Sequence, residues 1–487
     1  MNHDVDVVVV GAGPTGLLLA GDLARAGVNC LLLERRAERS GLTRAFTVHA
    51  RTLEQLDARG IADELIASGT PVRELRVFGS APLDLSGLPS RFPYVLVTPQ
   101  YETERVLEER AGPLGADTRY GHEVSGLTQQ PDGVEVRVEQ GGQHARAIRA
   151  RYVVGTDGMH STVRRALRMP FPGKPVVQSV MLADVRLTRP PSDAFTLSSS
   201  GDAFALVVPF GDGWYRVVAW HRHNQLPESA PVSLDDVSQA TSQALGVDYG
   251  MYEPRWLSRF HSEERQVPRY REGRVLLAGD AAHVHSPAGG QGMNTSIQDA
   301  ANLSWKLAAA VRGWAPEGML DSFDAERHPV GRQVLRNSGA LLRIGLTRPH
   351  VMGAARTLLA PAVSRIPFIA EYMVGTVSGL SISYPHPRGA HPLTGKRAPD
   401  WPLADGRRTY EALRDGRFLL AGSRPITADM TSGYGDRVDT VEVAYPPGII
   451  ALIRPDAYIA WAARWSDDLQ RSQIRGALTR WCGWSRR

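Results

Sequence analysis

The sequence has little cysteine, very little lysine and no long apolar run. Its two cysteines, Cys30 and Cys482, stand far apart, so neither a disulfide framework nor a metal site fits. No apolar run reaches the roughly 18 residues that a membrane-spanning helix needs. Acidic residues precede the first apolar run and no cleavage site follows it, so we expect no signal peptide and a soluble, cytoplasmic protein.

Positive charge is carried almost entirely by arginine. Three of the 56 basic residues are lysines, and the formal net charge is +5. The arginines are scattered, without a block of about five or six like charges. We therefore expect a solvated charged surface, with no nucleic-acid or membrane partner. The 487 residues are enough for about three domains with a large core.

A dinucleotide-binding motif lies at the start of the chain. Val7–Val10 and Leu31–Leu33 read as buried parallel strands with a helix between them. Glu34 follows the second strand, where a carboxylate accepts hydrogen bonds from ribose hydroxyls. The turn before the helix needs glycine for tightness, for close approach of a diphosphate and for helix packing. Its Gly-x-Gly-x-x-Gly glycines are Gly11, Gly13 and Gly16.

Two further predicted strands end in acidic turns. The segment Arg151–Leu167 is a buried strand that ends in Gly-Thr-Asp-Gly, with Asp157 in the turn and a short helix after it. The apolar strand 275–278 is followed by Asp280 and by a loop rich in Gly and Pro. The next helix has its small and apolar residues on one face. These residues are Ile297, Ala301, Ser304, Ala308 and Val311.

In this order, the three motifs resemble those of the class A flavoprotein monooxygenases, the FAD-dependent aromatic hydroxylases. The resemblance covers about Val5 to Pro329 and is nearest to the aromatic polyketide hydroxylases and rifampicin monooxygenases, on GDAAHVHSPAGGQGMNTSIQDAANLSWKLAAAV and DSFDAERHPVG. It implies an α/β fold with a Rossmann-like FAD-binding domain, a β-sheet substrate domain and a C-terminal thioredoxin-like domain. The expected boundaries are 1–169 with 271–385 for the discontinuous FAD-binding domain and its helical extension, 170–270 for the middle sheet, and 386–487 for the last domain.

The resemblance also implies which residues contact FAD. Asp280 holds a ribityl hydroxyl, and Pro287 crosses the isoalloxazine ring. The helix start from Gly290 to Asn294 directs its amides at the pyrimidine edge, where its partial positive charge stabilises anionic reduced flavin. The other implied contacts are Thr15 at the diphosphate, Arg35 and Val124 at the adenine, Arg44 where the cofactor crosses a loop, Gln100 at the ribityl chain, Asp157 near the diphosphate and nicotinamide, and Gly292 and Met293 in the helix start. Arg44 and Gln100 also fit ordinary surface positions, and Val124 also fits a plain core position.

Residues 170–270 break the alternation of strands and helices. The stretch AFALVVPFGDGWYRVVAWHRH predicts a hairpin, and in the family this sheet is a wall of the substrate cavity. His221 and His223 fit general bases, but surface polar residues are the simpler interpretation. Four aromatic residues are candidates for stacking on a flat substrate, although each also fits the core: Phe204, Phe210, Trp214 and Trp220.

The last third of the chain begins with a helical pattern over 329–384. The stretch YPHPRGAHPLTGKRAPDWP then reads as a linker, and IIALIRPDAYIAWAA predicts a hairpin. This part resembles the thioredoxin-like domain of polyketide and phenol hydroxylases but has no Cys-x-x-Cys. Dithiol chemistry is therefore excluded, and we expect a structural or interface role.

The activity that the resemblance implies is hydroxylation of a polycyclic phenol of polyketide type, in antibiotic biosynthesis. NADPH or NADH binds transiently and reduces FAD, and O2 then forms a flavin C4a-hydroperoxide that transfers oxygen. Because the cofactor carries this chemistry, we assign no catalytic side chain and no metal. We expect a monomer or a homodimer.

Three alternatives stay open to different degrees. Baeyer–Villiger oxygen insertion and antibiotic inactivation use the same flavin machinery, and no residue decides against them. Flavin-dependent halogenation is disfavoured because no Trp-x-Trp-x-Ile-Pro segment occurs. A non-catalytic protein that kept the dinucleotide fold is disfavoured by the presence of Glu34, Gln100 and Asp280.

Overall fold

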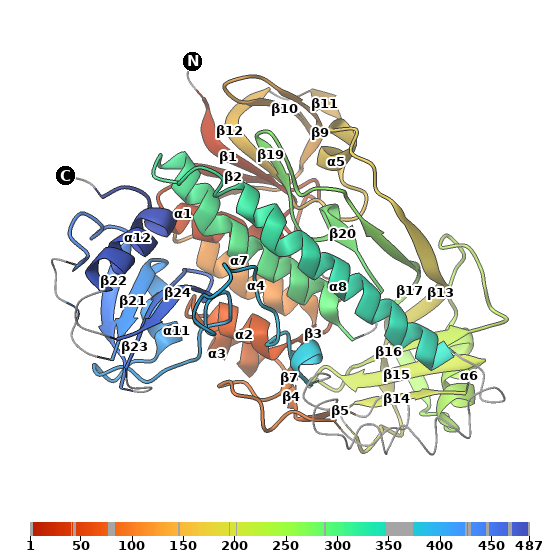
Figure 1. The fold of residues 1–487 in the computed structure, drawn as a ribbon. Coiled ribbons are helices and arrows are strands. Elements are labelled where there is room, and N and C mark those ends of the chain that lie inside the picture. The colour runs from red at the N-terminus through yellow and green to blue at the C-terminus, as the bar shows by residue number, and fades with distance from the viewer. Residues whose placement is uncertain are drawn as a thin grey trace.

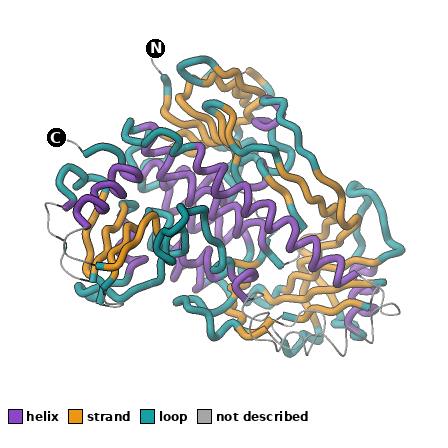
Figure 2. The backbone as a smooth tube through the Cα atoms, viewed as in Figure 1, coloured by secondary structure: helices purple, strands orange, loops and turns teal. Residues whose placement is uncertain are grey.

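The computed structural model describes residues 3–39, 41, 45–75, 83–144, 147–193, 195–200, 202–286, 289–346, 374–423, 426, 430–444, 448–465 and 470–485. Figure 1 shows a large sheet with its helices, a second sheet at the far end, and a smaller sheet formed by the C-terminal part. Two long helices, α7 (Gln291–Val311) and α8 (Asp321–Leu346), run side by side across the molecule between these sheets. Figure 2 shows the same arrangement by type of secondary structure.

The large sheet has a parallel centre. Its order is β11-β10-β12-β1-β2-β8, with β19 and β18 continuing from β12, and β9 paired with β10. Val7, Val8 and Val9 in its central strand are 0 % exposed, as a parallel strand covered on both faces requires. The strands are β1 (Val5–Val10), β2 (Cys30–Leu33), β8 (Asp117–Arg119), β9 (His122–Gln129), β10 (Val134–Gln140), β11 (Gln143–His144), β12 (Ile148–Gly155), β18 (Arg271–Glu272) and β19 (Val275–Leu277).

Helices pack against this sheet and against each other. Helix α1 crosses over between the parallel strands β1 and β2 and contacts both α4 and α7. Among the helices of the described ranges, none is both long and apolar enough to cross a membrane. The shorter helices are α1 (Pro14–Arg25), α2 (Ala50–Asp57), α3 (Ala62–Ala67), α4 (Gln100–Ala111), α5 (Thr162–Ala166) and the 3-10 turn η1 (Gly279–Ala281). Two small sheets beside α2 hold β3 (Thr47–Val48), β7 (Val95–Val97) and β4 (Thr70–Val72), and β5 (Glu74–Leu75) and β6 (Leu83–Asp84).

The second sheet is formed by β13 to β17 and by β20, which lie between residues 173 and 284. Its order is β14-β15-β16-β13-β17-β20, and the pair β15–β16 is the hairpin that the sequence predicts. Alternate side chains face helix α6 on one side and the large core on the other. The elements are β13 (Gly173–Leu187), β14 (Thr196–Ser199), β15 (Ala203–Pro209), β16 (Tyr215–His221), α6 (Leu234–Leu245), β17 (Met251–Gln266) and β20 (His283–Val284).

The C-terminal sheet has the order β22-β21-β23-β24, with β21 and β22 parallel and the other pairs antiparallel. The predicted hairpin is β23–β24. Whether the domain is thioredoxin-like stays a prediction, because residues 424, 425 and 427–429 between β21 and β22 lie outside the described residues. The elements are α11 (Thr409–Ala412), the 3-10 turn η2 (Leu413–Asp415), β21 (Phe418–Gly422), β22 (Val438–Glu442), β23 (Ile449–Ile453), β24 (Ile459–Arg464) and α12 (Gln470–Cys482).

The segment that the sequence indicates as a linker is irregular but packed. Tyr384, Ala398 and Trp401 are buried in it, and isolated bridges pair Ser383 with Lys396 and Arg397 with Tyr458. Proline and glycine predict the absence of regular structure correctly, but they say nothing of burial. The predicted domain boundaries stay predictions.

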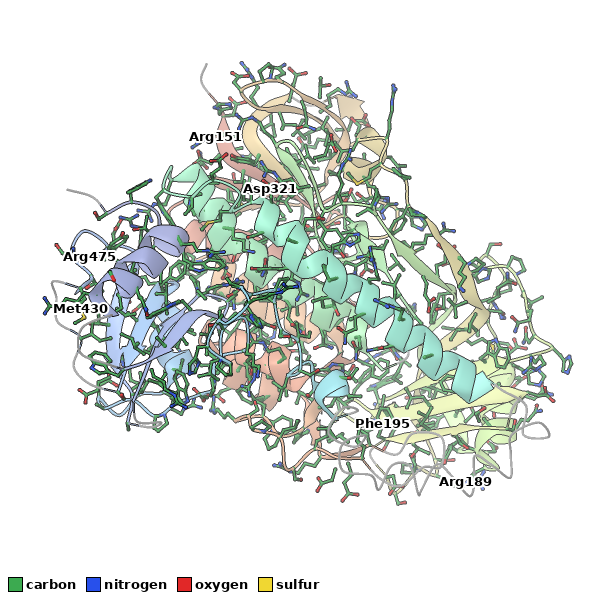
Figure 3. All side chains as sticks on the ribbon, viewed as in Figure 1. Arg151, Arg189, Phe195, Asp321, Met430 and Arg475 are labelled. Carbon is green, nitrogen blue, oxygen red and sulfur yellow. The ribbon has the colours of Figure 1, made fainter. Side chains whose placement is uncertain are left out.

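Charged side chains cover all parts of the molecule. Figure 3 shows Arg151 beside the large sheet, Arg189 at the second sheet and Arg475 in the C-terminal part. Cys30 and Cys482 are both buried free thiols, and burial raises the pKa of each.

Candidate functional site

The glycine-rich turn between β1 and α1 leaves space around the backbone at the start of α1. Gly11 has a φ of +102°, and a Cβ there would lie 2.6 Å from the Thr156 carbonyl oxygen. A Cβ on Gly16 would lie 2.0 Å from the Gly11 carbonyl oxygen, so only glycine allows this close packing of helix on strand. Gly13, just before α1, has no atom within 4 Å of its Cβ position. The arrangement fits a diphosphate bound at a helix N-terminus.

Glu34 directly follows β2 and is buried. Its carboxylate accepts hydrogen bonds from the backbone N–H groups of Ala12 (2.8 Å) and Arg36 (2.9 Å), and from Arg36 Nε (2.9 Å). Burial raises the pKa of Glu34, but the bonds from Arg36 and Ala12 outweigh burial and hold this pKa below its usual value. Arg36, which the sequence analysis did not assign, therefore orients this carboxylate. Arg35 is exposed, and its contact with adenine stays a prediction.

Strand β9 begins beside Glu34. The His122 backbone N–H donates to the Glu34 carbonyl oxygen at 2.9 Å, which brings Val124, two residues later, to the ribose end of the motif. Val124 is buried within the sheet. Its main-chain contact with adenine stays a prediction that this position permits.

Gln100 is the first residue of α4 and is tied to the loop after β2. Its Oε1 accepts a hydrogen bond from the Ala45 N–H at 3.1 Å, and its Nε2 donates to Glu104 Oε1 at 2.8 Å. Glu104 is buried, which is the main reason its pKa is raised. Glu104 was not among the predicted site residues, although its spacing of four residues from Gln100 on a helix was a signal. Arg44 lies outside the described residues.

Asp157 binds the first turn of helix α5, whose N-cap is Ser161. Its Oδ2 accepts hydrogen bonds from the N–H groups of Thr162 (2.7 Å) and Val163 (3.1 Å), and its Oδ1 accepts one from Ser161 Oγ. Burial raises the pKa of this carboxyl group. Both oxygens are thus engaged within the chain, so Asp157 shapes the turn. A direct bond to a nucleotide stays a prediction.

Asp280 is exposed between two buried neighbours, Gly279 and Ala281. Gly279 has a φ of +61°, and a Cβ on it would lie 2.8 Å from Thr15 Oγ1. The turn therefore packs on the first turn of α1, as a single site shared by both motifs requires. From the other side, the Gly279 N–H donates to Asp299 Oδ2 at 3.1 Å. The sequence analysis did not assign Asp299.

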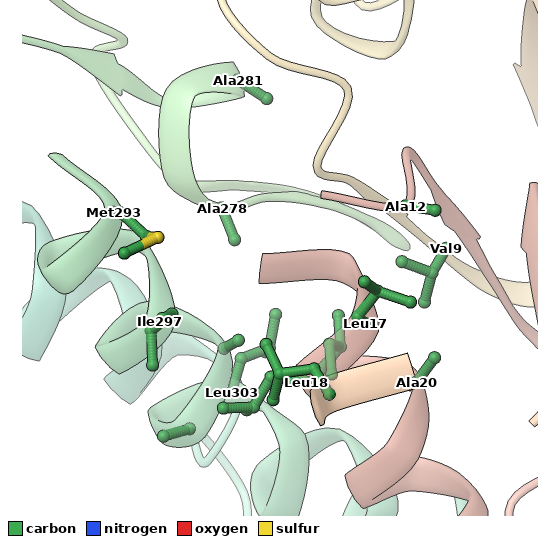
Figure 4. Close-up of a cluster of buried hydrophobic side chains, with 14 of the residues drawn as sticks. Val9, Ala12, Leu17, Leu18, Ala20, Ala278, Ala281, Met293, Ile297 and Leu303 are labelled. Carbon is green, nitrogen blue, oxygen red and sulfur yellow. The ribbon is translucent and has the colours of Figure 1, made fainter. Parts of the chain in front are cut away.

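Contacts between the motifs bring all three turns together. Thr156 Oγ1 donates to the Val10 carbonyl oxygen at 2.8 Å, linking the first two motifs. Arg164 Nη1 donates to the Ala281 carbonyl oxygen at 2.9 Å, linking the second and third. Figure 4 shows the core that the first and third motifs share, with labelled side chains that include Ala12, Ala281 and Met293.

Hydrogen bonds tie the entry to α7, the first turn of the helix, to strand β3. Gly290 precedes the helix with a φ of +62°, and a Cβ on it would lie 2.0 Å from Thr47 Oγ1. Asn294 Nδ2 donates to the carbonyl oxygens of Thr47 (2.9 Å) and Gly290 (2.7 Å), and its Oδ1 accepts from the His49 N–H (2.8 Å). The Asn294 side chain thus ties the start of α7 to β3. Gly292 and Met293 lie in the first turn of α7, and Pro287 lies outside the described residues.

Aromatic side chains line the core-facing side of the second sheet. Phe210 and Trp220 are buried there, and Phe204 and Trp214 pack partly buried against the same core. Trp220 Nε1 donates to the Gln178 carbonyl oxygen at 3.1 Å. Because these residues come from β15, β16 and the turn between them, they form one wall. Their contact with a substrate stays a prediction.

The two candidate bases lie elsewhere. His221 Nε2 is 2.7 Å from Gln243 Oε1 on helix α6, and His223 is exposed. The structure thus favours the surface interpretation over a role as general base. The polar group on the aromatic wall is instead an ion pair: Arg216 Nε and Nη2 donate to Asp184 at 2.6 and 2.9 Å.

The chain matches known protein families over most of its length. Residues 4–338 match the family described as "FAD binding domain", and residues 391–485 match "Aromatic-ring hydroxylase, C-terminal". The 12-dehydrotetracycline 5-monooxygenase/anhydrotetracycline 6-monooxygenase of Streptomyces rimosus is 40% identical, covering 98% of this chain and 99% of that protein. The rifampicin monooxygenase of Streptomyces venezuelae is 41% identical over 95% of this chain and 97% of its own.

A solved structure gives the same result for the fold. The OxyS anhydrotetracycline hydroxylase from Streptomyces rimosus superposes with a TM-score of 0.88 at 39% identity, covering 99% of this chain and 100% of that one. The chain belongs to the FAD-dependent aromatic-ring hydroxylases and is a flavin-dependent monooxygenase.

Proposed function

We propose that the protein hydroxylates a polycyclic phenolic substrate of polyketide type, with FAD as its cofactor, NADPH or NADH as reductant and O2 as oxidant. The observation that carries the proposal is the convergence of three turns at one edge of the large sheet, beside an aromatic wall on the second sheet. Relatives whose names specify anhydrotetracycline support the substrate class.

The residues present fit FAD. Gly13 leaves room for a diphosphate at the start of α1, and the fixed carboxylate of Glu34 suits a ribose hydroxyl. Asp280 is exposed within a turn whose neighbours are buried, which suits a carboxylate that accepts a ribityl hydrogen bond. The first turn of α7 directs N–H groups at the flavin ring and favours negative charge there. When bound and reduced, FAD supplies the activation of oxygen.

The second sheet supplies the other wall. Phe204, Phe210 and Trp220 on it suit a flat, fused-ring substrate, because aromatic rings stack on such rings with little polar cost. The protein's part in the reaction is to orient the ring and exclude water. We therefore expect no single acid or base on this wall to be indispensable.

For the reductant, we propose a hollow beside the Asp157 turn. Its volume is about 290 Å³, and its lining includes the basic side chains of His160, Arg164, His261 and Arg265 and the carboxylates of Glu228 and Glu263. Four basic side chains against two carboxylates favour the phosphates of a nicotinamide nucleotide, although Arg265 also donates to Glu263. Such a nucleotide needs no second dinucleotide fold if it binds only transiently. Replacing Arg265 by Ala should raise the KM for NADPH about tenfold and leave FAD content unchanged. An unchanged KM rejects this site.

The function is tested with purified holoprotein, NADPH and anhydrotetracycline as the probe. We expect a yellow protein whose NADPH and O2 consumption increases with the probe and whose product carries one added oxygen. Oxygen uptake that no polycyclic phenol changes rejects hydroxylation.

Antibiotic inactivation is the second candidate, favoured by the 41% identity to a rifampicin monooxygenase. The same assay with rifampicin distinguishes it. A Baeyer–Villiger reaction would be recognised by NMR of the product, because the oxygen then lies between two former carbon neighbours instead of on a ring carbon as a hydroxyl.

A further inference from the structure

A buried carboxylate on α7 supports the turn around Asp280, which follows β19. Asp299 Oδ2 accepts hydrogen bonds from the Gly279 N–H (3.1 Å) and His283 Nε2 (2.6 Å), and its Oδ1 accepts one from Arg327 Nε (2.7 Å). Arg327 Nη2 also donates to the Thr295 carbonyl oxygen, one turn earlier in α7, at 3.1 Å. Asp299 and Arg327 are both 0 % exposed. Arg327 on α8 thus holds the Asp299 carboxylate in place, and Asp299 in turn holds the backbone at Gly279.

The residue next to Arg327 belongs to a second buried cluster. Glu326 accepts hydrogen bonds from Arg454 Nη1 (2.7 Å) and Nη2 (2.9 Å), and from Lys306 Nζ (2.7 Å). Arg454 also donates through Nε to Asp456 Oδ1 at 2.9 Å. Asn302 on α7 donates to Glu326 at 2.7 Å. The cluster holds two positive and two negative side chains, all of them buried.

This second cluster joins the C-terminal part to the flavin-binding part. Arg454 and Asp456 lie in the turn between β23 and β24, whereas Glu326 is on α8. A second route runs through Tyr384, whose hydroxyl accepts from Arg327 Nη1 at 3.3 Å and whose ring stacks on Tyr458 with centroids 4.0 Å apart. Figure 1 shows the β21–β24 sheet beside α7 and α8. Helix α8 therefore makes two contacts. Its Glu326 binds the turn between β23 and β24, and its Arg327 binds Asp299, which supports the Asp280 turn.

Burying charges is costly, and apolar residues of similar size often give equal or greater stability. A buried charged cluster instead specifies one packing arrangement, because each charged group is satisfied only when its hydrogen-bond partners are in place. The two clusters, Asp299 with Arg327 and Glu326 with Arg454, together form a polar seam. This seam aligns α7, α8 and the turn between β23 and β24 with one another. Sliding either helix by a residue would leave a buried charge without its partner.

We propose that Arg454 and Arg327 are positioning residues of the flavin site, so that the C-terminal domain sets the placement of α7 and of the Asp280 turn. This inference rests on the placement of FAD proposed above. The domain is then a structural component of the cofactor site, and it acts there without any thiol chemistry of its own.

The test compares the FAD dissociation constants of full-length variants, measured from the flavin fluorescence released on dilution. Arg454→Met and Arg327→Met are each expected to weaken FAD binding about tenfold, as the displacement of one charged hydrogen bond would. The visible spectrum of bound flavin should lose its resolved shoulder in both. Arg437→Met is the matched control: Arg437 is buried within the C-terminal domain and donates to the carbonyl oxygens of Gly433 and Cys482. It should lower the melting temperature but leave FAD affinity unchanged.

An Arg454→Met variant that melts lower but binds FAD with unchanged affinity overturns the inference. Should that variant fail to fold, Arg454→Lys decides in its place. It keeps the charge but gives up the two-pronged contact, and a smaller loss of FAD affinity is expected, with no change overturning the inference. Asp280→Ala is measured alongside. If it too leaves FAD affinity unchanged, the placement of FAD is wrong. If it alone weakens binding, the placement stands and only the role of the seam is rejected.

Discussion

Glu34 and Asp280 are both carboxylates that follow parallel strands of the same sheet, yet the chain treats them differently. Glu34 is buried and bonded to Ala12 and Arg36. Asp280 is exposed, and the turn around it is held through Gly279 by Asp299 instead. At the position proposed for the ribose, the acid itself is held by the chain. At the position proposed for the ribityl chain, Asp299 supports the turn through Gly279, and Asp280 lies exposed beside it.

Replacing Asp299 should give the largest effect on stability, because Asp299 supports the Asp280 turn but is not itself a proposed FAD ligand. Asp299→Ala leaves the buried guanidinium of Arg327 without its counter-ion, which should cost about 3–5 kcal/mol of unfolding free energy. Urea unfolding of the apoprotein measures this loss without the flavin. Asp405→Ala is the control, since Asp405 forms an exposed pair with Arg407. A variant whose unfolding free energy matches that of Asp405→Ala would show that the support behind the Asp280 turn is dispensable.

Acid should affect the entry to α7 more than the turn around Glu34. The His49 N–H donates to Asn294 there, and the His285 ring lies 3.6 Å from the Cβ position of Gly292. Burial lowers the pKa of both His49 and His285 to about 4, so the folded protein keeps them neutral while the unfolded chain protonates them. Stability is therefore fully present above the ordinary value of 6.5 and is lost as pH falls toward 4. Each histidine should contribute about 3 kcal/mol to that loss. Burial raises the pKa of the Glu104 and Asp157 carboxyl groups, which opposes this loss, so the histidine contribution is the difference between the wild type and a histidine variant.

Urea unfolding at several pH values measures this dependence. His49→Gln, which can still donate to the Gly289 backbone, should flatten the pH profile between neutrality and pH 5. His223→Gln is the control at an exposed position. An identical profile for the wild type and His49→Gln would show that folding does not lower the pKa of His49.

Asp280→Ala should weaken FAD binding by about 1.5–3 kcal/mol through the loss of a charge-assisted hydrogen bond. Since Asp280 is exposed, the stability of the apoprotein should change by less than about 0.5 kcal/mol. Titration of apoprotein with FAD measures the first quantity, and urea unfolding measures the second. Full FAD occupancy after dialysis would contradict the placement of Asp280 at the ribityl chain.

Local pattern predicts the scaffold of the site well. The strand–turn–helix unit around Gly11, Gly13 and Gly16, the hairpin β15–β16 and the long helix α7 follow from glycine spacing and apolar periodicity, which act over a few residues. The family also follows from the three motifs taken together.

The supporting contacts could not be predicted in the same way. Whether Arg35 or Arg36 turns toward Glu34 depends on the direction the chain takes after β2. The pairing of Arg454 with Glu326 joins positions 128 residues apart, and no periodicity relates them. Asp299 could have been suspected, since a carboxylate on a buried helix needs a partner, but its partners His283 and Arg327 come from two other segments. Long-range polar contacts depend on the finished packing, so sequence pattern alone does not identify them.

Glu34→Gln should give the smallest effect and a mixed one, in contrast to Asp280→Ala. Glutamine keeps one acceptor for Ala12 or Arg36 but turns an N–H₂ toward donors that Glu34 now satisfies. Because Arg36 is partly exposed, solvent compensates for part of the loss, and the apoprotein should be destabilised by about 1 kcal/mol. FAD affinity should fall as well, since ribose loses a charged acceptor. If Glu34→Gln weakens FAD binding without changing the urea midpoint of the apoprotein, then Glu34, like Asp280, acts mainly on the ligand, and the two carboxylates differ only in their exposure.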